Sequence, residues 1–244
     1  TATARDGTIV GIGDVGTQVD VIMAIAEQVM SMAGGSLEDV VRSRAYITDS
    51  SLADATNRAL AKYFLSVRPA TTLIGVSQLG HPDQLIELEL EAIDGARAMA
   101  QRISSGHPHE EEFGYSRAVR MGNRVFVSGT ASLDQDGMVR HPGDPYAQTR
   151  HILDTIRCTL DQAGASINDL VNNRVFVTGI PHIKACSRAC KDALVGVTPS
   201  AMLMITSGLS HPDVMVEVEA EAIVGAADLR RDLFSGSSSE ESGG

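Results

Sequence analysis

The chain has few of the residues on which nucleic-acid-binding proteins, membrane proteins and disulfide-stabilised domains depend. It has no Trp, 4 Tyr and 5 Phe, and 20 Lys and Arg stand against 31 Asp and Glu, for a net charge of −11. We expect no nucleic-acid partner, because phosphate binding needs clustered cations and base stacking needs aromatic rings. No apolar run reaches the roughly 20 residues of a membrane helix, and the first residues lack a signal-peptide pattern. We therefore expect a cytoplasmic protein with no membrane partner.

The dominant feature that is present is an internal repeat. Residues 1–96 align with residues 131–226 without a gap, and about a third of the positions are identical. The identical positions include Gly13-Asp14 with Gly143-Asp144 and His81-Pro82-Asp83 with His211-Pro212-Asp213. A repeat of this length indicates two domains and not a solenoid.

The repeat and the composition together predict the domain organisation. We expect a first module at 1–97, a linker at 98–112, a complete second module at 113–228 and a disordered Ser-, Gly- and Glu-rich tail at 229–244. The second module begins with an extension, 113–130, in which Gly122-Asn123 signals a hairpin turn. The first module opens at Thr1 without that hairpin.

Three cysteines are too few for a disulfide framework. Cys186 and Cys190 share one face of an expected helix with His182, which raises the question of a metal site. The first module has Leu52, Thr56 and Leu60 at the aligned positions, so a face turned toward the core is the favoured interpretation, and we expect no metal.

Periodicity predicts the same order of elements in both modules: a strand, a long helix, a strand, a second helix and two strands. The expected helices are 18–32 and 52–64 in the first copy and 151–162 and 182–194 in the second. The alternation of the last strand places three carboxylates on one face in each copy. These are Glu87, Glu89 and Glu91, and Glu217, Glu219 and Glu221. Such a row demands water or basic partners, so it is either a solvated face or a polar cleft.

The ordered motifs of the second module carry a resemblance to a known family. They are Tyr115-Ser116-x-Ala118, Val125-Phe126-Val127-Ser128-Gly129, Gln148, Ala163-Gly164, Asp169-Leu170-Val171, Pro199 and Glu217-Val218-Glu219-Ala220. With them the chain resembles the reactive intermediate deaminase (RidA/YjgF) family, and the first module matches from Gly13 onward. The resemblance implies an α+β fold of two chorismate-mutase-like modules, each a mostly antiparallel sheet with two helices on one face. It further implies trimeric rings of modules with active sites in the clefts between neighbours.

For the chemistry, the resemblance implies hydrolysis of enamines or imines with release of ammonia and without a metal or cofactor. The Glu that holds and activates water matches Glu87 and Glu217. The Tyr and Ser of the hairpin match Tyr115 and Ser128, which only the second module has, and the Asn of the second helix matches Asn57.

The classical Arg after Pro-Ala, which clamps the substrate carboxylate, is absent in both copies. The first reads Pro69-Ala70-Thr71 and the second Pro199-Ser200-Ala201. Two other cations, Arg44 and Arg174, could supply the charge from another strand, and salt bridges to the Glu rows are the alternative.

The leading hypothesis is a hydrolytic deaminase of a small carboxylate-bearing enamine or imine, similar to an imino acid or 2-aminomuconate, with Glu217 or Glu87 as the base and Arg174 or Arg44 as the clamp. Two alternatives stay open. Cleavage before Thr1 would expose an N-terminal nucleophile, with the missing hairpin supplied as a separate chain. A non-catalytic ligand-binding protein is the second. Three chains would provide six modules, enough for two trimeric rings, so we expect a homo-oligomer.

Overall fold

The computed structural model describes residues 1–235 of the chain, with side chains to residue 230. The first part of the chain forms α1 (Val15–Met32), η1 (Leu37–Asp39), β1 (Val40–Ile47), η2 (Ser50–Leu52), α2 (Ala53–Phe64), β2 (Ala70–Gly75), β3 (Ile86–Ala92), α3 (Ala96–Met99), β4 (Gln101–Ile103) and α4 (Pro108–Glu112). The second part forms β5 (Ala118–Met121), β6 (Arg124–Ala131), α5 (Pro145–Gln162), η3 (Ile167–Asp169), β7 (Leu170–Val177), η4 (Ile180–His182), α6 (Ile183–Ala193), β8 (Ser200–Ile205), β9 (Val216–Ile223) and α7 (Ala226–Ser235).

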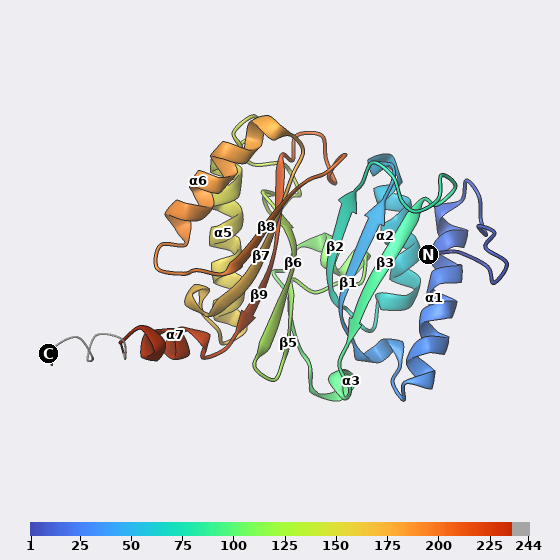
Figure 1. The fold of residues 1–244 in the computed structure, drawn as a ribbon, viewed down its shortest axis with the longest axis horizontal. Helices are drawn as coiled ribbons and strands as arrows, with labels where there is room; N and C mark the ends of the chain where they lie inside the picture. The colour runs from blue at the N-terminus through green and yellow to red at the C-terminus, as the bar shows by residue number, and fades with distance from the viewer. Residues whose placement is uncertain (236–244) are drawn as a thin grey trace, which may run out of the picture.

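The strands form one sheet in each module. The first sheet has the order β2-β1-β3 and the second the order β4-β5-β6-β9-β7-β8. In both, the strand after the first long helix (β1 or β7) pairs in parallel with the strand after the second helix and antiparallel with the last strand. Figure 1 shows the two sheets facing each other, with α1 and α2 outside the first and α5 and α6 outside the second. The expected α+β fold of two similar modules is confirmed.

A repeated glutamine fixes each long helix to the turn before the last strand. Gln18 on α1 is buried; its Nε2 donates to the carbonyls of Gly11 and Asp83, and its Oε1 accepts from the Leu85 amide. Gln148 on α5 makes the same three kinds of contact. Because a buried amide must have its hydrogen bonds satisfied, this residue determines where β3 and β9 begin. Those strands carry Glu87 and Glu217.

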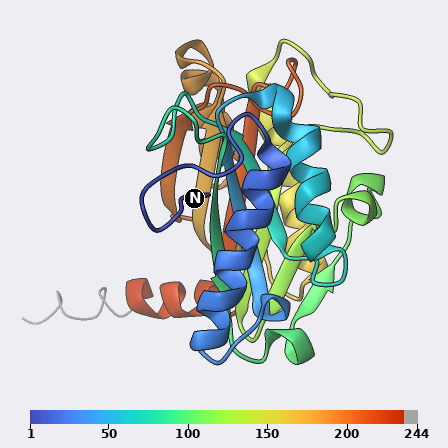
Figure 2. The same cartoon turned by 90° about the vertical axis from the view of Figure 1, so that its right-hand side faces the viewer.

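Each module has its own apolar core between its sheet and its two helices. In the first, Val19 and Met23 of α1 and Phe64 of α2 pack on Ala45 and Ile86 of the sheet. Figure 2 shows α1 (blue) and α2 (cyan) covering one face of that sheet. In the second module, Cys186 is fully buried in the core and Cys190 packs against it. The interpretation of this face as turned to the core is confirmed.

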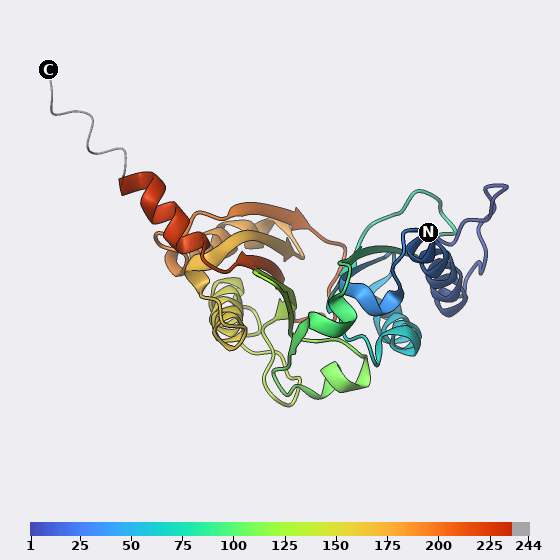
Figure 3. The same cartoon turned by 90° about the horizontal axis from the view of Figure 1, so that it is seen from below.

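The connection between the modules is structured. The segment expected as a linker, 98–112, contains β4 and α4, and β4 pairs with β5 of the second sheet. Viewed from below, the green connection runs along one side of the space between the modules (Figure 3). The expected tail overlaps the end of α7, and its residues 236–244 lie outside the described residues. None of the described helices has the length and apolar character needed to span a membrane.

The glutamate rows face the space between the sheets, where arginines pair with them. Arg44 of β1 is 1% exposed and holds Glu219 of β9 through two hydrogen bonds, from Nε at 2.7 Å and from Nη2 at 2.5 Å. Arg42 pairs with Glu91 of its own module and with Glu221 of the other. Glu89 pairs with Arg44 but is still 53% exposed, so the first row is partly solvated, whereas Glu219 and Glu221 of the second row are covered by their arginine partners. The rows and their arginines form an ionic contact that joins the two modules.

Candidate active site

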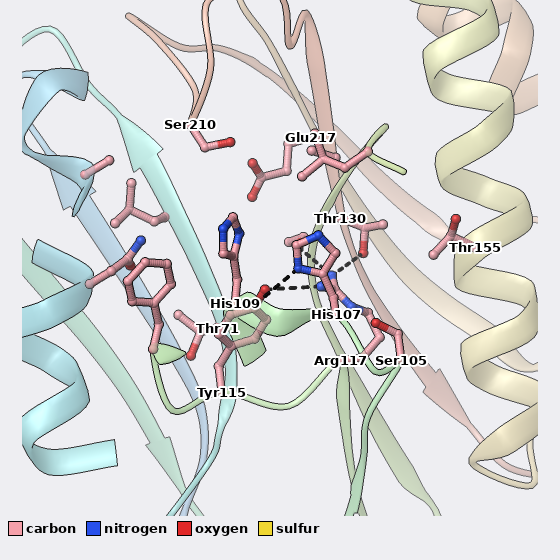
Figure 4. A pocket seen from close by; sticks show the side chains of 17 residues that line it. Thr71, Ser105, His107, His109, Tyr115, Arg117, Thr130, Thr155, Ser210 and Glu217 are labelled. Carbon is pink, nitrogen blue, oxygen red and sulfur yellow. Dashed lines mark hydrogen bonds between the residues drawn. The ribbon is translucent and has the colours of Figure 1, made fainter. Parts of the chain in front are cut away.

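A cavity of about 190 Å³ lies at one end of this contact, between the modules. The first module contributes Ala53 and Asn57 of α2 and Thr71 and Leu73 of β2. The connection and the second module contribute the rest of the wall: Ser105, His107, His109, Phe113, Tyr115, Arg117, Gly129, Thr130, Ala131, Leu133, Thr155, Ser210 and Glu217. Figure 4 shows the polar side chains of Glu217, His109, Tyr115 and Thr130 turned toward a common space.

Glu217 is the acid of this cavity. It lies on β9 opposite Ala131 of β6 and Phe176 of β7, and it is 6% exposed. Burial raises the pKa of its carboxyl to about 8, with Arg117 opposing the rise and Glu219 adding to it. The carboxyl therefore keeps its proton at neutral pH and can donate that proton to a bound molecule.

Gly129 provides the space for that carboxyl. A Cβ at this position would lie 2.0 Å from Oε1 of Glu217. The pairing of β6 with β9 is interrupted between Val127 and Thr130, so Gly129 sits in a β-bulge beside the carboxyl. Its amide donates to Oγ1 of Thr72 in the first module, 3.0 Å away. The bulge thus brings the acid, the hairpin and the other module together at one point.

Arg117 lies just before β5 and is 9% exposed. Its Nε donates to Glu110 at 3.2 Å, and its Nη1 donates to the Gly129 carbonyl at 3.1 Å and to Oγ1 of Thr130 at 3.4 Å. Its Nη2 donates to the hydroxyl of Tyr115 at 3.3 Å. Burial raises the pKa of that phenol, so Tyr115 stays neutral and can donate as well as accept.

Two histidines close the side of the cavity nearest the connection. Nδ1 of His107 accepts from the His109 amide at 3.3 Å, and the two rings meet edge to face with centroids 4.7 Å apart. Burial lowers the pKa of His107, which favours the neutral ring at neutral pH.

The structure brings three of the sequence-predicted site residues into this cavity: Glu217, Tyr115 and Asn57. Ser128 lies behind the wall, where its Oγ accepts from the Thr71 amide at 2.8 Å and donates to the Ser116 carbonyl at 2.6 Å. It joins the modules and does not line the cavity.

The other predicted residues lie elsewhere. Glu87 is half-buried on β3, opposite Tyr46, and is not part of this wall. Arg44 and Arg174 both pair with Glu219, so the salt-bridge interpretation describes their positions and the clamp interpretation does not. Thr1 is exposed, and its hydroxyl contacts that of Thr3 at 3.0 Å, away from the cavity.

Sequence reasoning missed Arg117, His107 and His109. Arg117 occupies the variable position of Tyr115-Ser116-x-Ala118, and the histidines fall in the segment that the sequence predicts to be a linker. The signal that could have found Arg117 is its place beside Tyr115. Residues 115 and 117 point to the same side of an extended chain.

The chain matches a family model described as Endoribonuclease L-PSP twice, over residues 1–94 and 108–224. An uncharacterized protein of Streptomyces coelicolor, SCO2049, is 37% identical over 128 residues, which are 52% of this chain and 95% of that protein. The crystal structure of Rv2704 from Mycobacterium tuberculosis, a member of the YjgF/YER057c/UK114 family, is similar with 35% identity and a TM-score of 0.47, covering 51% of this chain and 99% of the other. The Rid-family protein YyfA from Yersinia pestis is 26% identical with a TM-score of 0.46, over 51% and 99% of the two chains.

Proposed function

Because this chain belongs to the Endoribonuclease L-PSP (YjgF/RidA) family as a tandem duplication, we propose that it hydrolyses a small imine or enamine to a carbonyl compound and ammonia in the cavity between its modules. The proposal rests on the position of the Glu217 carboxyl. It is a buried acid at the wall of a cavity of about 190 Å³, and among the described residues no donor or acceptor forms a hydrogen bond with it. A buried polar group with no partner in the protein is suited to act on a bound molecule.

The protonation state of Glu217 sets the order of the steps. The neutral carboxyl donates its proton to the imine nitrogen, or to the carbon of an enamine, and forms an iminium ion. The resulting carboxylate then accepts a proton from water as the water oxygen bonds to the iminium carbon. The carbinolamine loses ammonia as its hydroxyl becomes the carbonyl. One water is consumed, one ammonia is released, and Glu217 ends protonated.

Residues from both modules support these steps. Tyr115 presents a neutral hydroxyl to the cavity, and Thr130 presents Oγ1, which donates to the Ser128 carbonyl at 2.9 Å. Asn57 contributes an amide from the first module. Hydroxyl and amide groups held on strands and helices can orient a water and a small substrate at little entropic cost. Because these polar groups come from both modules, we expect the site to need both copies of the repeat.

The description of the family as an endoribonuclease raises RNA cleavage as a competing activity. The composition disfavours RNA cleavage, because a net charge of −11 and scattered cations weaken the binding of a phosphate backbone. A 190 Å³ cavity also suits a small molecule better than a polymer.

The test is ammonia release from 2-imino acids, formed in the assay by an amino-acid oxidase, and from 2-aminomuconate. We expect turnover by the wild-type chain, a loss of at least about 100-fold in Glu217→Gln, and near-wild-type turnover in Glu87→Gln. The second variant is a matched control, because Glu87 is the aligned residue of the other module. Full activity in Glu217→Gln, or cleavage of RNA without ammonia release, would show the proposal to be wrong.

A further inference from the structure

We propose that the outer edge of β3, together with the face of α1 beside it, binds a β-hairpin supplied from outside residues 1–244. The two modules differ at this edge. In the second module β9 lies between β7 and β6, whereas β3 pairs with β1 alone among the described strands. Figure 1 shows β3 as the outer strand of the first sheet. The backbone N–H and C=O groups on its free side can therefore pair with an added strand.

The apolar residues of β3 are open to solvent where those of β9 are covered. On β9 the residues that alternate with the glutamates are at most 2% exposed: Val218, Ala220 and Ala222. On β3 the aligned residues are partly or fully exposed: Leu88, Leu90 and Ala92. Both copies have an apolar residue at each of the three positions, but only β9 has a second neighbouring strand to bury it.

The helices above the two strands differ in the same way. Val29 of α1 is 59% exposed, whereas the aligned Thr159 of α5 is 3% exposed. In the second module the hairpin of β5 and β6 runs along α5. Its residues Val125 and Val127 share a core cluster with the helix, and Arg120 donates to the Ala163 carbonyl at the helix end, 2.6 Å away. The hairpin therefore accounts for the burial that α5 has and α1 lacks.

These residues define the chemistry of the partner. A free strand edge beside exposed aliphatic side chains is the arrangement to which proteins add strands from a partner. Two strands are needed, because both β5 and β6 contribute to the core against α5, through Ala118 and through Val125 and Val127. The partner is thus a hairpin with small aliphatic residues on one face. A basic residue at the position of Arg120 would reach the carbonyl of Ala33, which aligns with Ala163.

A second copy of the chain does not offer such a hairpin. Its β6 already pairs with its own β9 from Arg124 to Ala131, and its β5 pairs with β4 and β6. Releasing this hairpin would expose the same apolar surface on β9 that it covered on β3. The hairpin that fits the β3 edge therefore comes from outside residues 1–244.

The first probe is a synthetic peptide of residues 117–131, the hairpin of the second module, because the two edges are aligned copies. We expect the wild type to bind it with a Kd of roughly 1 to 100 μM, since an isolated hairpin is marginally stable and must be ordered on binding. The same peptide with Val125→Glu and Val127→Glu should bind at least about tenfold more weakly, because both side chains face the helix in the second module.

A second protein removes the cost of bringing the hairpin to the edge. It carries a copy of residues 115–130 directly before Thr1, which aligns with Ala131, so the added hairpin is held at high effective concentration. By hydrogen exchange, the β3 amides that do not bond to β1 should exchange at least about tenfold more slowly than in the chain of residues 1–244.

Two substitutions on α1 locate the site. Val29→Glu should weaken peptide binding at least about tenfold and remove the added protection of the β3 amides, and it should leave the fold intact because Val29 is exposed. Met32→Glu is the matched control. Met32 is 83% exposed, and the aligned Gln162 stays exposed beside its hairpin, so this variant should remain within about twofold of the wild type.

Unchanged exchange of the β3 amides in the extended protein would overturn the inference. Equal binding of the peptide to wild type and Val29→Glu would also overturn it, because the peptide would then bind elsewhere. Dimers of the chain of residues 1–244 that Val29→Glu disrupts, seen by sedimentation without peptide, would assign the edge to a second copy and reject an outside hairpin.

Discussion

Replacing Glu217 by glutamine should make the protein more stable, by an amount that depends on pH. Burial holds the pKa of the folded-state carboxyl at about 8, against an ordinary value of 4.5. Between these two pH values the unfolded chain has released the proton and the folded chain retains it. The free energy of unfolding therefore falls as the pH rises through this window.

The size of the effect follows from the two pKa values. Each pH unit of the window corresponds to about 1.36 kcal/mol, so the wild type loses up to roughly 5 kcal/mol of stability between pH 4.5 and pH 8. A neutral amide at position 217 does not titrate. The two proteins should be about equally stable near pH 4.5, and Glu217→Gln should be the more stable by several kcal/mol at pH 8 and above.

The assay is urea denaturation of both proteins at half-unit steps from pH 4.5 to pH 9. Glu219→Gln, two residues away on the same strand, is a control of opposite sign. Burial alone would raise the pKa of Glu219, but the hydrogen bonds and charge of Arg44 outweigh burial and lower it. This carboxylate therefore stabilises the fold above its ordinary pKa, and its amide variant should be less stable than the wild type at pH 7. A stability difference between wild type and Glu217→Gln that is flat across the pH range would refute the reasoning.

Three further predictions follow from the same contacts. Gly129→Ala should lower turnover at least about 100-fold, because its Cβ would lie 2.0 Å from Oε1 of Glu217 and 2.9 Å from Cγ2 of the buried Thr72. It should also lower the free energy of unfolding by about 1 to 3 kcal/mol, because both buried side chains must move. An active variant would contradict the placement of Glu217. Wild-type kcat/KM should fall about tenfold per pH unit above pH 8, because Glu217 ionises there and can no longer donate its proton. A kcat/KM that does not change up to pH 10 would exclude Glu217 as the acid. Arg44→Ala should reduce the free energy of unfolding by about 3 kcal/mol, because Glu219 would stay buried with only Arg174 and the Thr72 hydroxyl as close partners. The exposed Arg58→Ala should change it by less than about 1 kcal/mol.

The fold of each module could be predicted because its determinants are local or repeated. Gln18 and Gln148 recur at the same place, and in the structure both tie a helix to the turn before the last strand. The capping boxes of Ser36 with Asp39 and Ser166 with Asp169 recur in the same way. Sequence periodicity and turn chemistry record such interactions, since both partners lie within one module.

The site could be predicted only in part, because its geometry depends on contacts between modules. Glu217 and Glu219 look alike in the sequence, on one face of one strand. Arg44 from the opposite sheet pairs with Glu219, whereas Glu217 lines the cavity. No periodicity in β9 distinguishes the two. The same limit explains why the sequence alone makes Arg44 a candidate clamp, because its partner carboxylate, Glu219, lies in the other module.

The differences between the two copies carry information that their shared residues do not. On β2, Thr71 donates its amide to Ser128, and Thr72 donates its hydroxyl to Glu219 at 2.9 Å and accepts from the Gly129 amide. The aligned residues of β8 are Ala201 and Met202, both exposed and without a hydroxyl. The second copy could not replace the first in this contact, because the buried Glu219 and the bulge at Gly129 would each lose a partner. Polar residues found in one copy and replaced by apolar ones in the other therefore mark the surface where the modules meet, and in this chain that surface contains the cavity.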